Sequence, residues 1–71
     1  MHDLTKTFGR RVRGRRAILG WNQGALAMRA NISRAQIARI ERGESSPKLD
    51  TVQQIAEALD VDVAALLEPI D

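Results

Sequence analysis

The fold is decided by residues 19–43, which read LGWNQGALAMRANISRAQIARIERG. Apolar residues recur three and four positions apart on both sides of a short polar break at residues 31–33. This spacing is typical of two amphipathic helices, and it predicts helices over about 23–30 and 34–42. A connection of about three residues requires these helices to meet at a tight corner.

Helix-capping residues stand at the ends of both predicted helices. Asn22 and Ser33 occupy the expected N-cap positions, and Gly20 and Gly43 follow the ends of helices. Gln36 lies three residues after Ser33, which is the spacing of a capping box. The local sequence therefore predicts where these helices begin and end.

The rest of the chain also has helical periodicity and shows no strand pattern. Leu4, Phe8, Val12 and Leu19 form one apolar stripe of a first helix, over about 4–19. Two more helices are predicted after the loop at residues 43–48, over about 49–59 and 63–68. We expect an all-α fold of five short helices in one domain, residues 1–71.

The composition argues against an enzyme or a metal protein. The 71 residues include no cysteine and one histidine, His2, next to the terminus, so we expect no catalytic residue, metal or cofactor. No apolar run approaches the roughly 18 residues of a membrane span, and no signal-peptide pattern opens the chain. We expect a cytoplasmic protein with no membrane partner and no evident small-molecule ligand.

The charges divide the chain into two parts of opposite sign. Residues 1–48 hold all eleven basic residues and three acidic ones, a net charge of +8. Residues 49–71 hold six acidic residues and no basic one, a net charge of −6. The basic block predicts that the partner is a polyanion. Because this block contains a predicted helix-turn-helix at about 22–42, we expect the polyanion to be double-stranded DNA.

Four blocks of sequence carry a resemblance to a known family. They are LGWNQGALA at 19–27, NIS at 31–33, IERGESSPKL at 40–49 and IAEALDV at 55–61. In this order they resemble the lambda-repressor-like, Cro/C1-type (XRE) helix-turn-helix family. The resemblance implies a five-helix DNA-binding domain of a transcriptional regulator, similar to restriction-modification controllers and phage repressors, or such a domain within a longer regulator.

The predicted helix at 34–42 is the candidate reading helix, because the second helix of such a motif enters the major groove. Arg34 and Arg39 can each bond both acceptors of a guanine, and the Ala35 methyl can contact a thymine methyl. The resemblance places base contacts at these same three positions. Gln36 has two alternative roles: its side chain either forms a capping bond to Ser33 or contacts an adenine.

Residues beside the reading helix are candidates for phosphate contacts, which set register without reading sequence. The resemblance implies such a contact for Gln23, at the positive end of its helix. Asn22 and Ser33 combine a capping role with a possible phosphate contact. Donors past the reading helix complete this set: Arg42, Ser45, Ser46 and Lys48.

Arg16 continues the apolar stripe of the first helix, and Glu41 lies between the inward-facing Ile37 and Ile40. Two inward-pointing opposite charges are expected to pair, because an unpaired buried charge is very costly. The resemblance supports the same structural ion pair. The other arginines of this helix, Arg10, Arg11, Arg13 and Arg15, are expected on a solvated face that adds long-range attraction to DNA.

The last block holds more apolar residues than one short helix needs for its own packing: Val61, Val63, Leu66, Leu67 and Ile70. We expect a homodimer in which Val63, Leu67 and Ile70 face the second subunit on a palindromic site. The alternative is that all five pack inward. Two other functions stay open: an antitoxin-like interaction module whose acidic half binds a basic partner, and an RNA-binding domain.

Overall fold

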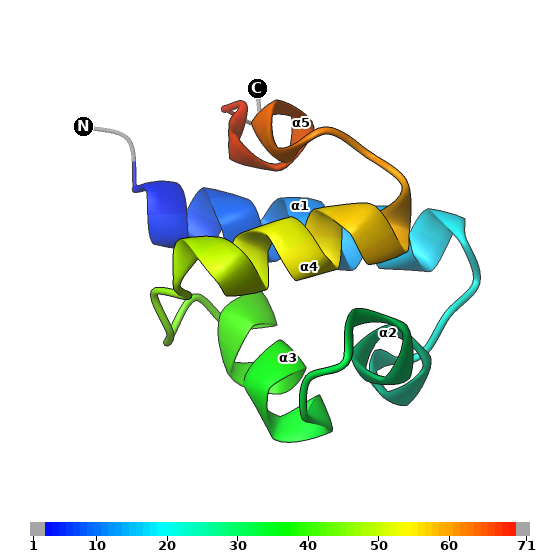
Figure 1. Ribbon diagram of the computed structural model, residues 1–71. Coiled ribbons are helices and arrows are strands. Elements are labelled where there is room, and N and C mark those ends of the chain that lie inside the picture. Colours follow the sequence, from blue (N-terminus) through cyan, green and yellow to red (C-terminus); the bar gives the residue numbers. More distant parts are fainter. Residues whose placement is uncertain (1–2, 70–71) are drawn as a thin grey trace.

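The computed structural model describes residues 3–69, and this range contains five helices and no strand (Figure 1). The helices are α1 (Leu4–Ile18), α2 (Gln23–Ala30), α3 (Arg34–Glu41), α4 (Leu49–Leu59) and α5 (Val63–Leu67). The predicted all-α fold is confirmed, and every predicted helix end lies within one residue of the observed one. Within residues 3–69, no helix has the length and apolar character needed to cross a membrane.

The first helix organises the arrangement. α3 packs against one side of α1 and α5 against the other, while α4 lies beside α1 and packs on α2 (Figure 1). Among the described residues, the centre of the core is formed by fully buried side chains from four helices: Val12, Leu26, Ile37, Ile40, Ile55 and Leu59. Phe8 and Val12 of the predicted apolar stripe of α1 are buried, as expected, whereas Leu4, in the first turn of the helix, is 56% exposed.

The helix starts follow the predicted capping chemistry around the corner. The Asn22 side chain accepts a hydrogen bond from the Ala25 backbone N–H at 2.8 Å. Ser33 and Gln36 form the complete capping box at the start of α3. At the two later helices, Lys48 and Asp62 occupy the N-cap positions without a side-chain capping bond, so their starts depend on packing instead.

Helix ends use the left-handed conformation that capping requires. Gly20 and Gly43 have φ of 71° and 73°. Asn31 and Asp60 adopt the same region with φ of 59° and 57°, and these residue types tolerate it best after glycine. The turn after α4 therefore has the left-handed backbone conformation usual for glycine, although the residue there is Asp60.

Gly9 allows α1 and α3 to approach closely. It is buried, and a Cβ built on it would overlap the carbonyl oxygen of Ile40 and lie 3.1 Å from that of Glu41. Only a residue without a side chain permits this crossing. Gly14, later in the same helix, is different, because a methyl group added there would meet no atom within 4 Å.

The predicted Arg16–Glu41 ion pair is present and largely buried. Arg16 Nε donates to Glu41 Oε2 at 2.7 Å and Nη2 donates to Oε1 at 2.8 Å, a two-bond arrangement that fixes orientation as well as distance. The Glu41 side chain is 4% exposed and that of Arg16 is 16% exposed. Arg16 Nη1 also donates to the Trp21 carbonyl at 2.8 Å, which ties the α1–α2 turn to the same pair.

Two arginines that were expected on a solvated face have structural roles instead. Arg11 Nε and Nη2 donate to the carbonyls of Glu68 and Pro69 at 3.1 and 2.7 Å, just past α5. Arg15 Nε donates to the Leu59 carbonyl at 3.4 Å, at the end of α4. Cations at helix C-termini satisfy carbonyls that have no partner within the helix. Arg10 and Arg13 are exposed, as predicted.

Replacing Gly9 with alanine should lower the free energy of unfolding by about 1–3 kcal/mol or more, because the added methyl forces α1 and α3 apart. Gly14→Ala is the matched control and should raise stability by about 0.5–1 kcal/mol, since it adds helix propensity without a contact. Thermal and denaturant unfolding measure both. Equal effects of the two variants would contradict the close crossing.

Replacing Glu41 with glutamine should lower the free energy of unfolding at neutral pH by up to about 3–5 kcal/mol, because Arg16 loses its counter-charge. Burial by itself raises the pKa of Glu41, but hydrogen bonds from Arg16 and Gln23 and the charges of Arg16 and Arg13 outweigh it, so the pKa lies below its ordinary value. This stabilisation is complete above the ordinary pKa of 4.5 and is lost as pH falls through the lower folded-state pKa.

The difference in stability between the wild type and Glu41→Gln should therefore narrow as the solution is acidified below that ordinary pKa. Glu44→Gln removes a carboxylate from an exposed pair with Arg42 and should change stability little. Denaturant unfolding across pH measures all three proteins. A Glu41→Gln variant as stable as the wild type at neutral pH would show that the buried pair contributes nothing.

Candidate nucleic-acid interface

The corner between α2 and α3 is formed by residues 31–33 and is held by backbone bonds. Asn31 takes the left-handed conformation, and the Ile32 N–H donates back to the Ala27 carbonyl at 3.0 Å. Ser33 then starts α3 as its N-cap. These bonds fix the direction in which α3 leaves α2, which is the requirement of a helix that must enter a groove.

The outer face of α3 carries the side chains predicted to read bases. Arg34, Ala35 and Arg39 are exposed, while Ile37 and Ile40 on the opposite face are buried in the core. Neither Arg34 nor Arg39 has a side-chain hydrogen bond or ion pair within residues 3–69. The two guanidinium groups are therefore available to a ligand without first breaking an internal contact.

The two possible roles of Gln36 are partly resolved. Its Oε1 accepts from the Ser33 backbone N–H at 3.1 Å, and its backbone N–H donates to Ser33 Oγ at 3.1 Å. Ser33 Oγ also lies 3.3 Å from the same oxygen. The capping role is thus confirmed, and it leaves the Nε2 amide donor of Gln36 as the group available for any outward contact.

The candidate phosphate contacts at the start of α2 are already engaged within the protein. Asn22 caps the helix, as described above. The Gln23 Nε2 group donates to Glu41 Oε1 at 3.1 Å, so Gln23 joins the buried ion pair. An amide nitrogen carries two hydrogens, and one of them remains for a phosphate.

The candidates after α3 differ in their surroundings. Arg42 forms an exposed ion pair with Glu44, with Nε–Oε2 and Nη2–Oε1 distances of 3.0 and 3.1 Å. An exposed pair of this kind is weak and exchanges readily with solvent or another anion. Ser45 and Lys48 line a hollow of about 320 Å³ together with Arg39, which places polar donors beside the reading face.

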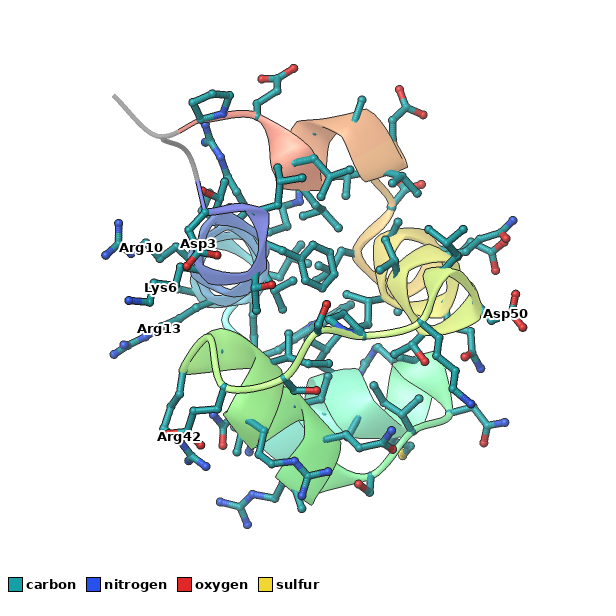
Figure 2. The ribbon with its side chains drawn as sticks, turned by 90° about the vertical axis from the view of Figure 1, so that its left-hand side faces the viewer. Asp3, Lys6, Arg10, Arg13, Arg42 and Asp50 are labelled. Atoms are coloured by element: carbon teal, nitrogen blue, oxygen red, sulfur yellow. The ribbon has the colours of Figure 1, made fainter. Side chains whose placement is uncertain are left out.

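Charge is distributed unevenly around the molecule. Figure 2 shows Lys6, Arg10, Arg13 and Arg42 projecting from one side and Asp50 from the opposite side. Asp3, the N-cap of α1, lies on the same side as these four cations (Figure 2). Within residues 3–69, no group of three histidine, aspartate or glutamate side chains is arranged to hold a metal ion.

The residues expected at a subunit contact are less exposed than that role suggests. Val63 and Leu67 are half-buried and pack against the core, Leu66 is buried, and Ile70 lies outside the described residues. Parts of Val63 and Leu67 remain accessible. The large apolar side chains with the most exposure lie elsewhere: Leu4, Ile18, Met28 and Leu49.

Two contacts made by side chains of α2 were not predicted from the sequence. The Arg29 guanidinium lies 4.2 Å from the centre of the Trp21 ring, a cation–π contact that covers the α1–α2 turn. The Gln23–Glu41 bond was also missed. Both contacts join residues whose separation in sequence gives no helical or turn signal, so only the packing of α2 against its neighbours reveals them.

Known proteins resemble this chain in sequence and in fold. Residues 12–66 match the family model described as Helix-turn-helix (HTH_3). The HTH-type transcriptional regulator SutR of Escherichia coli (strain K12) is 32% identical over 69 residues, which are 97% of this chain and 39% of that protein. The Immunity repressor protein of Bacillus phage phi105 is 38% identical over 61 residues, 86% of this chain and 42% of that protein.

The chain thus spans less than half the length of these two relatives. Among solved structures, the restriction-modification controller protein C.AhdI from Aeromonas hydrophila superposes with a TM-score of 0.84 and 31% identity, covering 87% of this chain and 94% of that one. The relatives are named as regulators and a repressor, in agreement with the expectation of a non-enzymatic protein. Because the family match covers most of the chain, the protein belongs to the Cro/C1-type helix-turn-helix family, as the sequence resemblance predicted.

Proposed function

We propose that this protein is a transcriptional regulator that binds double-stranded DNA sequence-specifically, with the N-terminal half of α3 in the major groove. The observation that carries the proposal is the outer face of α3. Two arginines that have no side-chain partner within residues 3–69, and a methyl group, project from a helix whose opposite face is buried in the core. The relatives named as transcriptional regulators and as a phage repressor support the same role.

Arg34, Ala35 and Arg39 are assigned to the bases. Residues 34 and 39 are separated by about 7.5 Å along a helix axis, which is about two base-pair steps of 3.4 Å. Each arginine can bond N7 and O6 of a guanine, and Ala35 suits a thymine methyl. Gln36 can give a base only its Nε2 donor while its oxygen caps α3, so two-bond recognition of adenine would require opening the cap.

The phosphate contacts are assigned to the two helix starts and to the loop after α3. Asn22, Gln23 and Ser33 lie where backbone N–H groups and the helix dipole attract an anion. On the other side of α3, the donors are Arg42, Ser45, Ser46 and Lys48. Contacts on both sides of the reading helix would fix its depth and register in the groove.

A homodimer is the proposed functional unit, with Val63, Leu67 and Ile70 toward the second subunit. One short reading helix covers too few base pairs to locate a site in a genome. A two-fold dimer reads two half-sites about 34 Å apart. The accessible parts of Val63 and Leu67 lie on α5, on the far side of α1 from α3 (Figure 1).

An interaction module is the second candidate, and one observation favours it: exposed carboxylates are concentrated on and around α4 and α5. Such a surface fits a basic protein partner. Competition assays separate the candidates. If the protein is a DNA-binding regulator, unlabelled specific duplex displaces the labelled specific duplex at a much lower concentration than random duplex or RNA does. Selection of bound duplexes from a random pool supplies that specific sequence.

Replacing Arg34 with alanine should cost about 1–3 kcal/mol of discrimination between the selected site and random DNA, because a guanine contact is lost. Lys48→Ala is the control from the phosphate class, and it should weaken binding to all duplexes alike and lower the salt slope by about one. Anisotropy titrations over a range of salt measure both. If Arg34→Ala weakened binding to both duplexes equally, Arg34 would belong to the phosphate class.

Sedimentation of the free protein at micromolar concentrations should show a dimer that Leu67→Glu disrupts, because a charge would be buried at the contact. Met28→Glu changes an exposed apolar residue of α2 and should leave the dimer intact. Circular dichroism establishes that both variants are folded. A wild-type protein that stays monomeric at every concentration, free and on DNA, would refute the dimer.

A further inference from the structure

Three exposed cations on α1, unlike its other arginines, hold no carbonyl or carboxylate of another element by a hydrogen bond within residues 3–69. Lys6, Arg10 and Arg13 follow one another at four and three positions, so they share one face of the helix. All three are exposed, and none forms a hydrogen bond or ion pair with another side chain in residues 3–69. Their neighbours Arg11, Arg15 and Arg16 all hold internal partners. We call these three residues the α1 basic face.

The α1 basic face lies beside the C-terminal end of α3. The stem of Lys6 covers Gly43, since a Cβ built on Gly43 would lie 2.9 Å from Lys6 Cγ. The charge of Arg13 acts on Glu41, in the last turn of α3. Figure 2 shows all three side chains on the same side of the molecule as Arg42. The cations therefore lie on the side of the molecule that carries Arg42, next to the C-terminal end of α3 (Figure 2).

We infer that the α1 basic face binds phosphates of the duplex that flanks the sequence read by α3. This inference rests on the proposed function and extends its contact beyond the reading helix and the loop. From Lys6 to Arg13 the helix rises about 10 Å, which is long enough to contact several phosphates of one strand. Flexible cationic side chains need only charge and reach to bind a phosphate backbone.

The chemistry of the face favours DNA over an acidic protein. Protein contacts generally have an apolar centre with charges at the rim. The helix face between and beyond these cations offers only Asp3, whose side chain caps α1, and the small Ala17. With no large apolar side chain on it, the face suits a phosphate backbone, whose contacts are electrostatic.

The test uses the duplex recovered by selection in two lengths. One is trimmed to the recovered motif, and the other carries about 10 additional base pairs, one helical turn, at each end. The slope of log K against log salt concentration is measured for the wild type and for the variant Lys6→Gln/Arg10→Gln/Arg13→Gln. On the extended duplex the slope should fall in magnitude by about 2–3, since each phosphate contact contributes about 0.9. On the trimmed duplex the two proteins should have equal slopes.

Four further variants test whether the effect depends on the position of the charges and whether it can be seen without the triple variant. Adding Asp50→Asn, Glu57→Gln and Glu68→Gln to the triple variant restores the net charge at exposed positions of α4 and just after α5, and it should not restore the slope. The single variants Lys6→Gln, Arg10→Gln and Arg13→Gln should each lower the slope by about one on the extended duplex only. Circular dichroism melting confirms that each variant is folded.

The outcomes separate this inference from the proposed function. If the wild type binds no duplex specifically, the proposed function fails and the inference fails with it. If the wild type binds the selected site specifically and the triple variant has the same slope as the wild type on the extended duplex, the inference alone is overturned. The inference is also overturned if the triple variant loses the same amount of slope on both duplex lengths, or if restoring the net charge restores the slope. Salt-dependent self-association of the wild type without DNA, absent from the triple variant, would overturn it too.

Discussion

The placement of α3 depends on the buried carboxylate of Glu41. This carboxylate receives two bonds from Arg16 on α1 and one from Gln23 on α2, and Arg16 also holds the Trp21 carbonyl. One ion pair therefore fixes α1, the α1–α2 turn, α2 and the end of α3 relative to one another. Gly9 permits this arrangement, because any side chain there would push α3 away from α1.

The start of α3 is fixed by a second, local set of contacts. Asn31 turns the chain, and Ser33 and Gln36 exchange capping bonds. These contacts and the Glu41 network hold opposite ends of an eight-residue helix. A helix of this length is not stable by itself, so its orientation is the orientation that its two ends impose. In the proposed complex, the exposed arginines of α3 would therefore enter the groove with little loss of backbone conformational freedom.

Features governed by local sequence were predictable. The caps at Asn22 and Ser33 follow from residue type and position alone. The Arg16–Glu41 pair followed from the placement of two charges on buried faces, an argument that uses helical periodicity and the cost of an unpaired charge. Non-local features were not predictable. The bonds of Arg11 and Arg15 to the ends of α5 and α4 join residues 44 to 58 positions apart, and the need for glycine at position 9 depends on which helix crosses there.

In the proposed complex α3 is the contact surface, and most of α4 and α5 lies away from the DNA. The most direct measurement is a titration of the isotopically labelled protein with the selected duplex, followed by the backbone amide resonances. If α3 reads the duplex, the largest shifts fall on residues 33–42, with smaller ones at 22–23 and 45–48, and α4 beyond its first turn changes little. Shifts confined to the acidic α4 and α5, with the amides of α3 unmoved, would contradict this role for α3.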